Sequence, residues 1–380
     1  MNDGRRLKGW RPPLGFLGML GLVMAIEWTV SGHDLDFTAP WHWDWRVIGK
    51  AATRPDRVKD KEFLFFGDSL VKFGLMPRVI QQGTGKPAYN FALHTGQTSS
   101  SYFMLRRTLR AGAKPSAVVL DLTPHMFMHH PDVNKSLWAE LLSPEECLDL
   151  ASAMKDSAFF ARTMLEKVLP TFKERQEIRA NLMAALQGLS TSRRFEIPSY
   201  RRNWKLNDGA QLMGYIGAPT INPDEWANNL YSRWEPDPVN VAYLDRFLSL
   251  AAEHQITVYW LLPPIHPEVQ VRTDASQFDL AYTRFVKQIQ DRFPKTVVLD
   301  SRHSGFSPDL FLDGAHVNRR GALKLSVALA DLLRESGNKV EKLRWVSLDL
   351  SRTRDYEGSI EDVNQSVVAV RADALAAKRR

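Results

Sequence analysis

The sequence has 380 residues, of which 44% are apolar and 24% are charged, and its net charge is +7. A chain of this length and composition is globular and can bury a large core. Its single cysteine, Cys147, excludes an internal disulfide. The sequence contains no CxxC and no HExxH motif, which argues against a zinc ribbon and a zincin-type metalloprotease.

The N-terminus has the order of a signal sequence, because basic residues precede an apolar run from Leu14 to Ile26. The run is shorter than the roughly 20 apolar residues of a transmembrane helix, and no small-x-small cleavage site follows it. We expect residues 1–30 to form an uncleaved signal anchor, which makes the protein a single-pass cell membrane protein with its domain outside the cytoplasm. A cleaved signal peptide, giving a secreted or periplasmic protein, and a buried amphipathic helix are the alternatives. We do not expect an exported chain to bind nucleic acid.

Residues 31–60, rich in tryptophan and charge, are predicted to be a connecting arm. After the arm, short apolar runs of strand character occur at 62–66, 88–92, 117–122, 256–262 and 296–300, and helical patterns at 99–112, 240–255 and 279–293. This alternation predicts a three-layer α/β/α fold of flavodoxin-like type, with a central parallel five-stranded sheet. Active sites in such folds form beyond the carboxyl ends of the strands.

The α/β domain is predicted to have two halves, 61–130 and 240–336, with a mainly helical insertion at 131–239 and a charged tail at 337–380 that offers one further strand-like segment. The insertion carries a group of basic and aromatic residues that is either a solvated basic surface or part of a lid that binds an anionic or carbohydrate substrate. Its members are Arg193, Arg194, Tyr200, Arg201, Arg202 and Trp204.

Two short segments carry candidate catalytic residues. Ser69 follows the first strand in "FLFFGDSL", where it is either the N-cap of a helix or a nucleophile at the sheet edge. Near the end of the domain, "LFLDGAHVN" places Asp313 and His316 three positions apart in one turn. A carboxylate so placed can fix the imidazole tautomer and stabilise the imidazolium when histidine takes a proton.

These segments resemble the SGNH, or GDSL, hydrolases over roughly residues 60–130 and 240–335. "FFGDSL" is similar to the first conserved block and "DGAHVNRRG" to the last, which implies a triad of Ser69, His316 and Asp313. "YNFALHTGQTS" is similar to the second block, which implies that the N–H groups of Gly96 and Ser69 donate to an oxyanion. In the third block the family has an asparagine where this sequence has Thr123, whose hydroxyl is expected to donate in its place.

Further residues are candidates for substrate binding: Asp68 beside the nucleophile, and His125 and His266 after predicted strands. These histidines have no readable carboxylate partners, so we expect no metal site and no cofactor. The resemblance implies an extracytoplasmic serine esterase that removes acyl groups, with acetyl the expected group, from a carbohydrate or related polymer. An O-acyltransferase supplied by a membrane-embedded donor protein and a non-catalytic glycan-assembly protein on the same scaffold are the alternatives.

Overall fold

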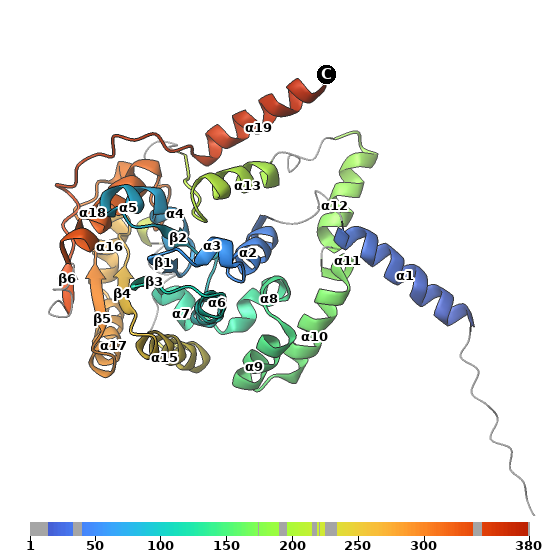
Figure 1. The fold of residues 1–380 in the computed structure, drawn as a ribbon, viewed down its shortest axis with the longest axis horizontal. Coiled ribbons are helices and arrows are strands. Elements are labelled where there is room, and N and C mark those ends of the chain that lie inside the picture. Colours follow the sequence, from blue (N-terminus) through green and yellow to red (C-terminus); the bar gives the residue numbers. More distant parts are fainter. Residues whose placement is uncertain are drawn as a thin grey trace, which may run out of the picture.

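The computed structural model describes residues 14–32, 40–173, 175–189, 196–214, 219, 221–224, 234–336 and 344–378. Its centre is one six-stranded sheet in the order β2-β1-β3-β4-β5-β6, in which every pair of neighbours is parallel (Figure 1). The strands are β1 (Phe63–Phe66), β2 (Ala88–Asn90), β3 (Ala117–Asp121), β4 (Thr257–Leu262), β5 (Thr296–Asp300) and β6 (Trp345–Ser347).

Both faces of the sheet are buried, because successive side chains of a strand point to opposite faces. In β1, Leu64 and Phe66 belong to one hydrophobic core, whereas Phe63 and Phe65 belong to the other. The first core is covered by α6 (Thr98–Arg110), α15 (Pro238–Glu253) and α17 (Gln277–Arg292), and the second by α4 (Ser69–Gly74), α5 (Pro77–Thr84) and α18 (Arg319–Ser336). The predicted three-layer parallel α/β fold is therefore confirmed.

The prediction of five strands is wrong by one, because β6 extends the sheet beyond β5. Val298 of β5 lies opposite Trp345, and Asp300 lies opposite Ser347. The backbone of β5 would otherwise leave one row of hydrogen-bonding groups unpaired at the edge of the sheet. The short strand after α18 satisfies part of that row.

The segment predicted as a connecting arm contains α2 (Pro40–Ala51) and α3 (Pro55–Val58). Trp43, Trp45 and Ile48 of α2 are buried in the first hydrophobic core. Their helix packs against α8 of the insertion, and the Trp45 and Trp138 rings meet edge to face at 5.0 Å. The α2 helix is thus an integral part of the folded body.

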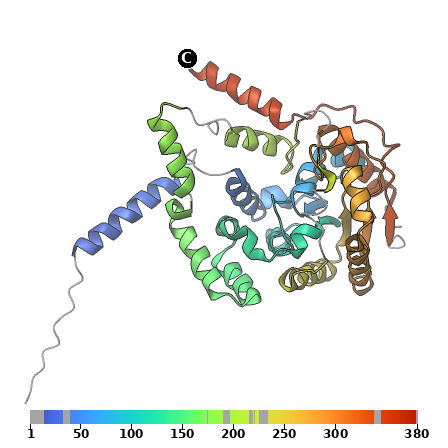
Figure 2. The ribbon, with the colours of Figure 1, turned by 180° about the vertical axis from the view of Figure 1, so that it is seen from behind.

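The insertion is mainly helical, as predicted, and lies beside α2 (Figures 1 and 2). One of its helices, α13, packs against the C-terminal helix α19. The remaining helical elements are α7 (Pro124–Met128), η1 (Pro131–Asn134), α8 (Lys135–Leu141), α9 (Pro144–Met154), α10 (Ser157–Val168), α11 (Pro170–Lys173), α12 (Arg175–Leu186), α13 (Glu196–Leu206), α16 (Pro267–Asp274), η3 (Pro308–Leu310) and α19 (Val363–Lys378).

The apolar N-terminal run forms α1 (Leu14–Gly32), which projects from the body and touches α11 (Figures 1 and 2). Most of its apolar side chains are exposed, but Glu27 is buried and accepts a hydrogen bond from the Thr171 N–H at 2.9 Å. Among the described helices, none has the length and apolar character needed to span a membrane. The signal anchor predicted over residues 1–30 lies partly outside the described part of the chain, and so do the basic residues before α1.

Candidate active site

Ser69 lies where the sequence pattern places it, just past the carboxyl end of β1 and at the first position of α4. The turn between strand and helix requires Gly67, whose φ is +137° and whose absent Cβ would lie 2.6 Å from the carbonyl oxygen of Asp121. Asp68 caps α4 by accepting a hydrogen bond from the Leu70 N–H at 2.8 Å. The N-cap of α4 is therefore Asp68 and not Ser69, which is the first residue of the helix and stands at the sheet edge.

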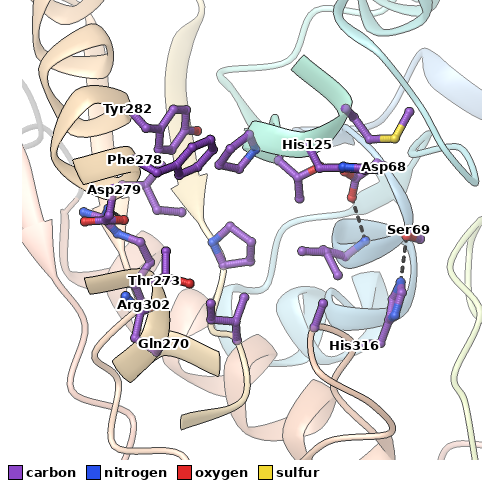
Figure 3. Close-up of a pocket in the computed structure, with 18 of the residues that line it drawn as sticks. Asp68, Ser69, His125, Gln270, Thr273, Phe278, Asp279, Tyr282, Arg302 and His316 are labelled. Carbon is purple, nitrogen blue, oxygen red and sulfur yellow. Dashed lines mark hydrogen bonds and ion pairs between the residues drawn. The ribbon is translucent and has the colours of Figure 1, made fainter. Parts of the chain in front are cut away.

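Ser69, His316 and Asp313 form one connected hydrogen-bonded row. Ser69 Oγ lies 2.8 Å from His316 Nε2 (Figure 3), and His316 Nδ1 lies 2.9 Å from Asp313 Oδ2. With Nδ1 protonated, the imidazole donates to the carboxylate and presents the Nε2 lone pair to the Ser69 hydroxyl. This is the geometry of a serine nucleophile with a general base and an orienting carboxylate.

The loop that carries His316 is held on several sides. Asp313 Oδ1 accepts hydrogen bonds from the backbone N–H groups of Ala315 and His316, each at 2.8 Å. Leu312 N–H donates to the carbonyl of His316 at 2.7 Å, which closes the loop on itself. Burial alone would raise the pKa of Asp313, but the hydrogen bonds from His316 and Ala315 outweigh it and lower that pKa. Asp313 is therefore ionised at neutral pH.

His266 supports this loop and does not line the cavity at Ser69. It caps α16, packs edge to face on Phe311, and donates its backbone N–H to the carbonyl of Gly314 at 3.1 Å. Burial lowers the pKa of its imidazole, and no described group lies within hydrogen-bonding distance of its Nε2 atom. The structure therefore places His266 behind the loop that carries Asp313 and His316.

The predicted oxyanion donors have other partners in this structure. The Gly96 N–H donates to the carbonyl of Leu93 at 3.0 Å, and the Thr123 hydroxyl donates to the Asp68 carboxylate. Either group must exchange that partner before it can bind an oxyanion. The N–H groups in the first turn of α4, including that of Ser69, have no acceptor within their own helix.

Gly96 has a second role, which is steric. A Cβ at this position would overlap the carbonyl oxygen of Gly67. The loop after β2 therefore lies against the turn that carries Ser69, with no room for a side chain at position 96. Thr95, the preceding residue, adopts a left-handed φ of +53° and is held by a hydrogen bond of 2.9 Å from its hydroxyl to Asn134. The loop after β2 therefore fixes the turn that carries Ser69.

Asp68, next to Ser69 in the chain, and Asp121 form a buried acidic pair. Both side chains are almost fully buried, and no described donor lies within hydrogen-bonding distance of the Asp121 oxygens. Burial raises the pKa of Asp68. Burial and the adjacent Asp68 carboxylate raise the pKa of Asp121 well above its ordinary value. Burial and the neighbouring carboxylate thus favour the protonated form of Asp121 more strongly than that of Asp68.

A cavity of about 300 Å³ opens beside Ser69 and His316. Figure 3 shows Ser69 and His316 at one end, and Phe278, Asp279, Tyr282 and Arg302 at the other. Arg302 is neutralised there by ion pairs of 2.6 Å with Asp279 and 2.7 Å with Asp300. The rest of the wall is largely apolar and includes Leu70, Met126, Leu262, Pro263 and Ile265.

His125, a candidate for substrate binding, lines this cavity, and burial lowers the pKa of its imidazole. Thr123 and Asp68 line it as well. Among the described residues, no group of three or more His, Cys, Asp or Glu side chains is placed to hold a metal ion.

Among the described residues, the basic and aromatic side chains of the insertion do not form one cluster. Arg202 is ion-paired with Glu361 at 2.7 Å, and Trp204 is buried between Trp43 and Tyr89. Tyr200 lines a second cavity near His316. Arg201 is half-buried on α13, while Arg193 and Arg194 lie outside the described residues.

Sequence reasoning missed a buried group next to the candidate triad. Lys72, one turn after Ser69 on α4, is buried and pairs with Asp44 of α2 at 2.6 Å. His94 follows β2, and the centroid of its ring lies 3.7 Å from that of Trp41. The spacing of three residues between Ser69 and Lys72 could have placed Lys72 near Ser69 on the same helix. No local sequence pattern, however, indicates that α2 packs against Lys72.

The fold and the site together define a class: a parallel α/β protein with a Ser-His-Asp row at the carboxyl edge of its sheet. Within that class, the family described as "Protein of unknown function (DUF1574)" matches residues 46–322, and the chain belongs to this family. The matched range contains Ser69, Asp313 and His316. A comparison with curated proteins finds no match.

Proposed function

We propose that this protein is a serine esterase of the SGNH type, in which Ser69 forms an acyl-enzyme with acyl esters of a carbohydrate or related polymer. The observation that carries the proposal is the row of contacts from Ser69 Oγ to His316 Nε2 at 2.8 Å and from His316 Nδ1 to Asp313 at 2.9 Å. The resemblance of the segments around these residues to SGNH hydrolases adds to it.

In the first step, His316 takes the Ser69 proton as Oγ attacks the ester carbonyl, and then gives it to the leaving alcohol. Asp313 holds the imidazole in the required tautomer and stabilises the imidazolium formed during attack. In the second step, water loses a proton to His316 and attacks the acyl-enzyme, which frees Ser69 and releases the acid. The backbone N–H of Ser69, at the first position of α4, has no acceptor within its own helix and can donate to the developing oxyanion.

We also propose that the N-terminal segment directs the domain out of the cytoplasm, where a carbohydrate polymer is the substrate. The exposed apolar residues of α1 and the basic residues before it support this location. A reporter that is active only outside the cytoplasm, fused to the C-terminus of the full chain, should be active. A reporter that is active only when residues 1–32 are removed would contradict the proposal.

The proposed chemistry is tested by steady-state hydrolysis of p-nitrophenyl acetate and butyrate by the full-length protein. Ser69→Ala and His316→Asn should each lower the turnover number by at least about a thousandfold. Ser351→Ala is the matched control, because Ser351 is exposed and lines neither cavity at the site. Turnover that is equal in wild type and Ser69→Ala would contradict an esterase at this site, and no turnover in the wild type would favour a non-catalytic role.

A further inference from the structure

Two cavities meet at the catalytic histidine. The cavity beside Ser69, of about 300 Å³, and a second one of about 410 Å³ share His94 and His316 in their walls. Ser69 lines only the first cavity, whereas Asp313 lines only the second. His316 therefore borders both cavities, and its Nε2 atom, which faces Ser69, is the ring nitrogen that can take a proton.

The second cavity has the composition of a ligand site. Trp41, Phe73, Tyr200, Met213 and Leu312 give it a mainly apolar and aromatic wall, to which the Gln211 side chain adds an amide. Small-molecule sites are commonly apolar cavities of this kind with a few polar groups that fix orientation.

Trp41 is the most unusual member of this wall. It is 47% exposed, although the neighbouring tryptophans of α2, Trp43 and Trp45, are buried. Its ring packs on His94 at a centroid distance of 3.7 Å, which holds a large aromatic surface beside the catalytic group. A fixed, half-exposed aromatic ring offers an apolar face on which the C–H face of a pyranose can stack.

Among the described residues of its wall, the second cavity has one carboxylate without a cationic partner, that of Asp313. The Asp44 carboxylate in its wall is paired with the buried Lys72 at 2.6 Å. Burial lowers the pKa of His94 to about 3, so that imidazole is neutral at physiological pH. The described residues of the wall include no arginine or lysine, and an anionic sugar therefore finds no cation among them.

We propose that the second cavity binds a neutral pyranoside whose hydroxyl group accepts the acyl group, with its ring stacked on Trp41 and Tyr200. This inference rests on the proposed function and makes the protein an acyltransferase for such acceptors. The acyl group occupies the largely apolar first cavity while it is bound to Ser69. The acceptor hydroxyl gives its proton to His316 and attacks the acyl carbonyl, and Ser69 Oγ leaves and takes that proton back.

The test measures how the acyl-enzyme partitions between water and sugar. Full-length protein is supplied with p-nitrophenyl butyrate and increasing methyl glucopyranoside or a neutral glucan oligosaccharide, and butyrate and butyrylated sugar are quantified. Both products come from one acyl-enzyme, so their ratio does not depend on how fast Ser69 is acylated. We expect sugar ester in the wild type and a transfer-to-hydrolysis ratio about tenfold lower in Trp41→Ala.

Trp41→Phe should retain most of the ratio because it keeps an aromatic face, and Trp28→Ala, at an exposed tryptophan of α1, should leave it unchanged. Sugar binding to Ser69→Ala, measured by calorimetry with and without Trp41→Ala, provides a readout that needs no turnover.

A ratio and a binding constant that Trp41→Ala does not alter would overturn the inference. A uronic acid oligosaccharide that accepts better than the neutral one would overturn the assigned substrate class. If the wild type hydrolyses the ester and never forms sugar ester, the esterase proposal stands and the acceptor site does not; if Ser69 is not acylated at all, both proposals fail.

Discussion

Lys72 Nζ lies 2.6 Å from Asp44 Oδ1, and both side chains are buried. The pair joins α4, which begins with Ser69, to α2, which contributes Trp41 to the second cavity. Asp44 also accepts a hydrogen bond of 3.4 Å from the His94 N–H. This relationship links α2, the loop after β2 and the helix that begins with the candidate nucleophile in one structural unit.

Breaking this pair should destabilise the fold strongly. Lys72→Met or Asp44→Asn leaves one buried group without its partner, and we expect a loss of about 3–5 kcal/mol in the free energy of unfolding. The double variant should be more stable than the worse single variant, because no uncompensated charge remains. Urea unfolding of the three variants checks this expectation. The exposed pair Arg54–Asp56 is the control, and Arg54→Ala should have little effect on the free energy of unfolding. Single variants of Lys72 or Asp44 that unfold like wild type would show that the buried pair is dispensable.

Asp121 should make the protein less stable as the pH rises. Burial and the Asp68 charge raise its pKa in the folded state well above the unfolded value. Below about pH 4, Asp121 is protonated in both the folded and the unfolded state and has no effect on the pH dependence. Above this pH, Asp121 loses its proton first in the unfolded state. The free energy of unfolding therefore falls until the pH reaches the raised pKa of the folded state. Asp121→Asn removes this penalty, because an amide does not ionise.

The measurement for Asp121 is urea unfolding of wild type and Asp121→Asn from about pH 4 to pH 8. The stability of the variant relative to wild type should increase with pH across this range. Asp56→Asn, at an exposed position, should show little change. A difference between Asp121→Asn and wild type that is the same at every pH would mean that Asp121 is ionised in the folded protein.

Gly96→Ala should impair both stability and ester hydrolysis. The added methyl group overlaps the Gly67 carbonyl, and the turn that carries Ser69 must shift to accommodate it. Overpacking of this kind costs about 1–3 kcal/mol. Gly74→Ala is the matched control on α4, since its methyl group would lie 3.5 Å from Leu325 and 3.6 Å from Val317, which is ordinary contact. Thermal unfolding and p-nitrophenyl ester hydrolysis are compared for both; full activity in Gly96→Ala would show that the turn tolerates the shift.

The sequence predicts the parts of this protein that depend on local patterns. Apolar runs of strand length locate β1 to β5, and the positions of Ser69 and His316 after strands place them at one edge of the sheet. The carboxyl ends of parallel strands share one edge of the sheet. This topology brings Ser69 and His316 within hydrogen-bonding distance of each other.

Features that depend on distant partners are not predictable in this way. Trp43 and Trp45 are buried because α2 meets α8, which lies about ninety residues further along the chain. Arg202 is paired because Glu361 of the C-terminal segment reaches it. The Thr123 hydroxyl faces Asp68 and not an oxyanion site, which depends on how β1 and β3 stand side by side. Composition gives no sign of any of these contacts.

The most direct test of the central claim is intact-mass analysis of the full-length protein after reaction with a fluorophosphonate probe. We predict a single adduct, located by peptide mapping on Ser69, its absence in Ser69→Ala, and slower labelling of Asp313→Asn because the imidazole is no longer held in the required tautomer. An unlabelled wild-type protein, or an adduct that persists in Ser69→Ala, would contradict the assignment of Ser69 as the nucleophile.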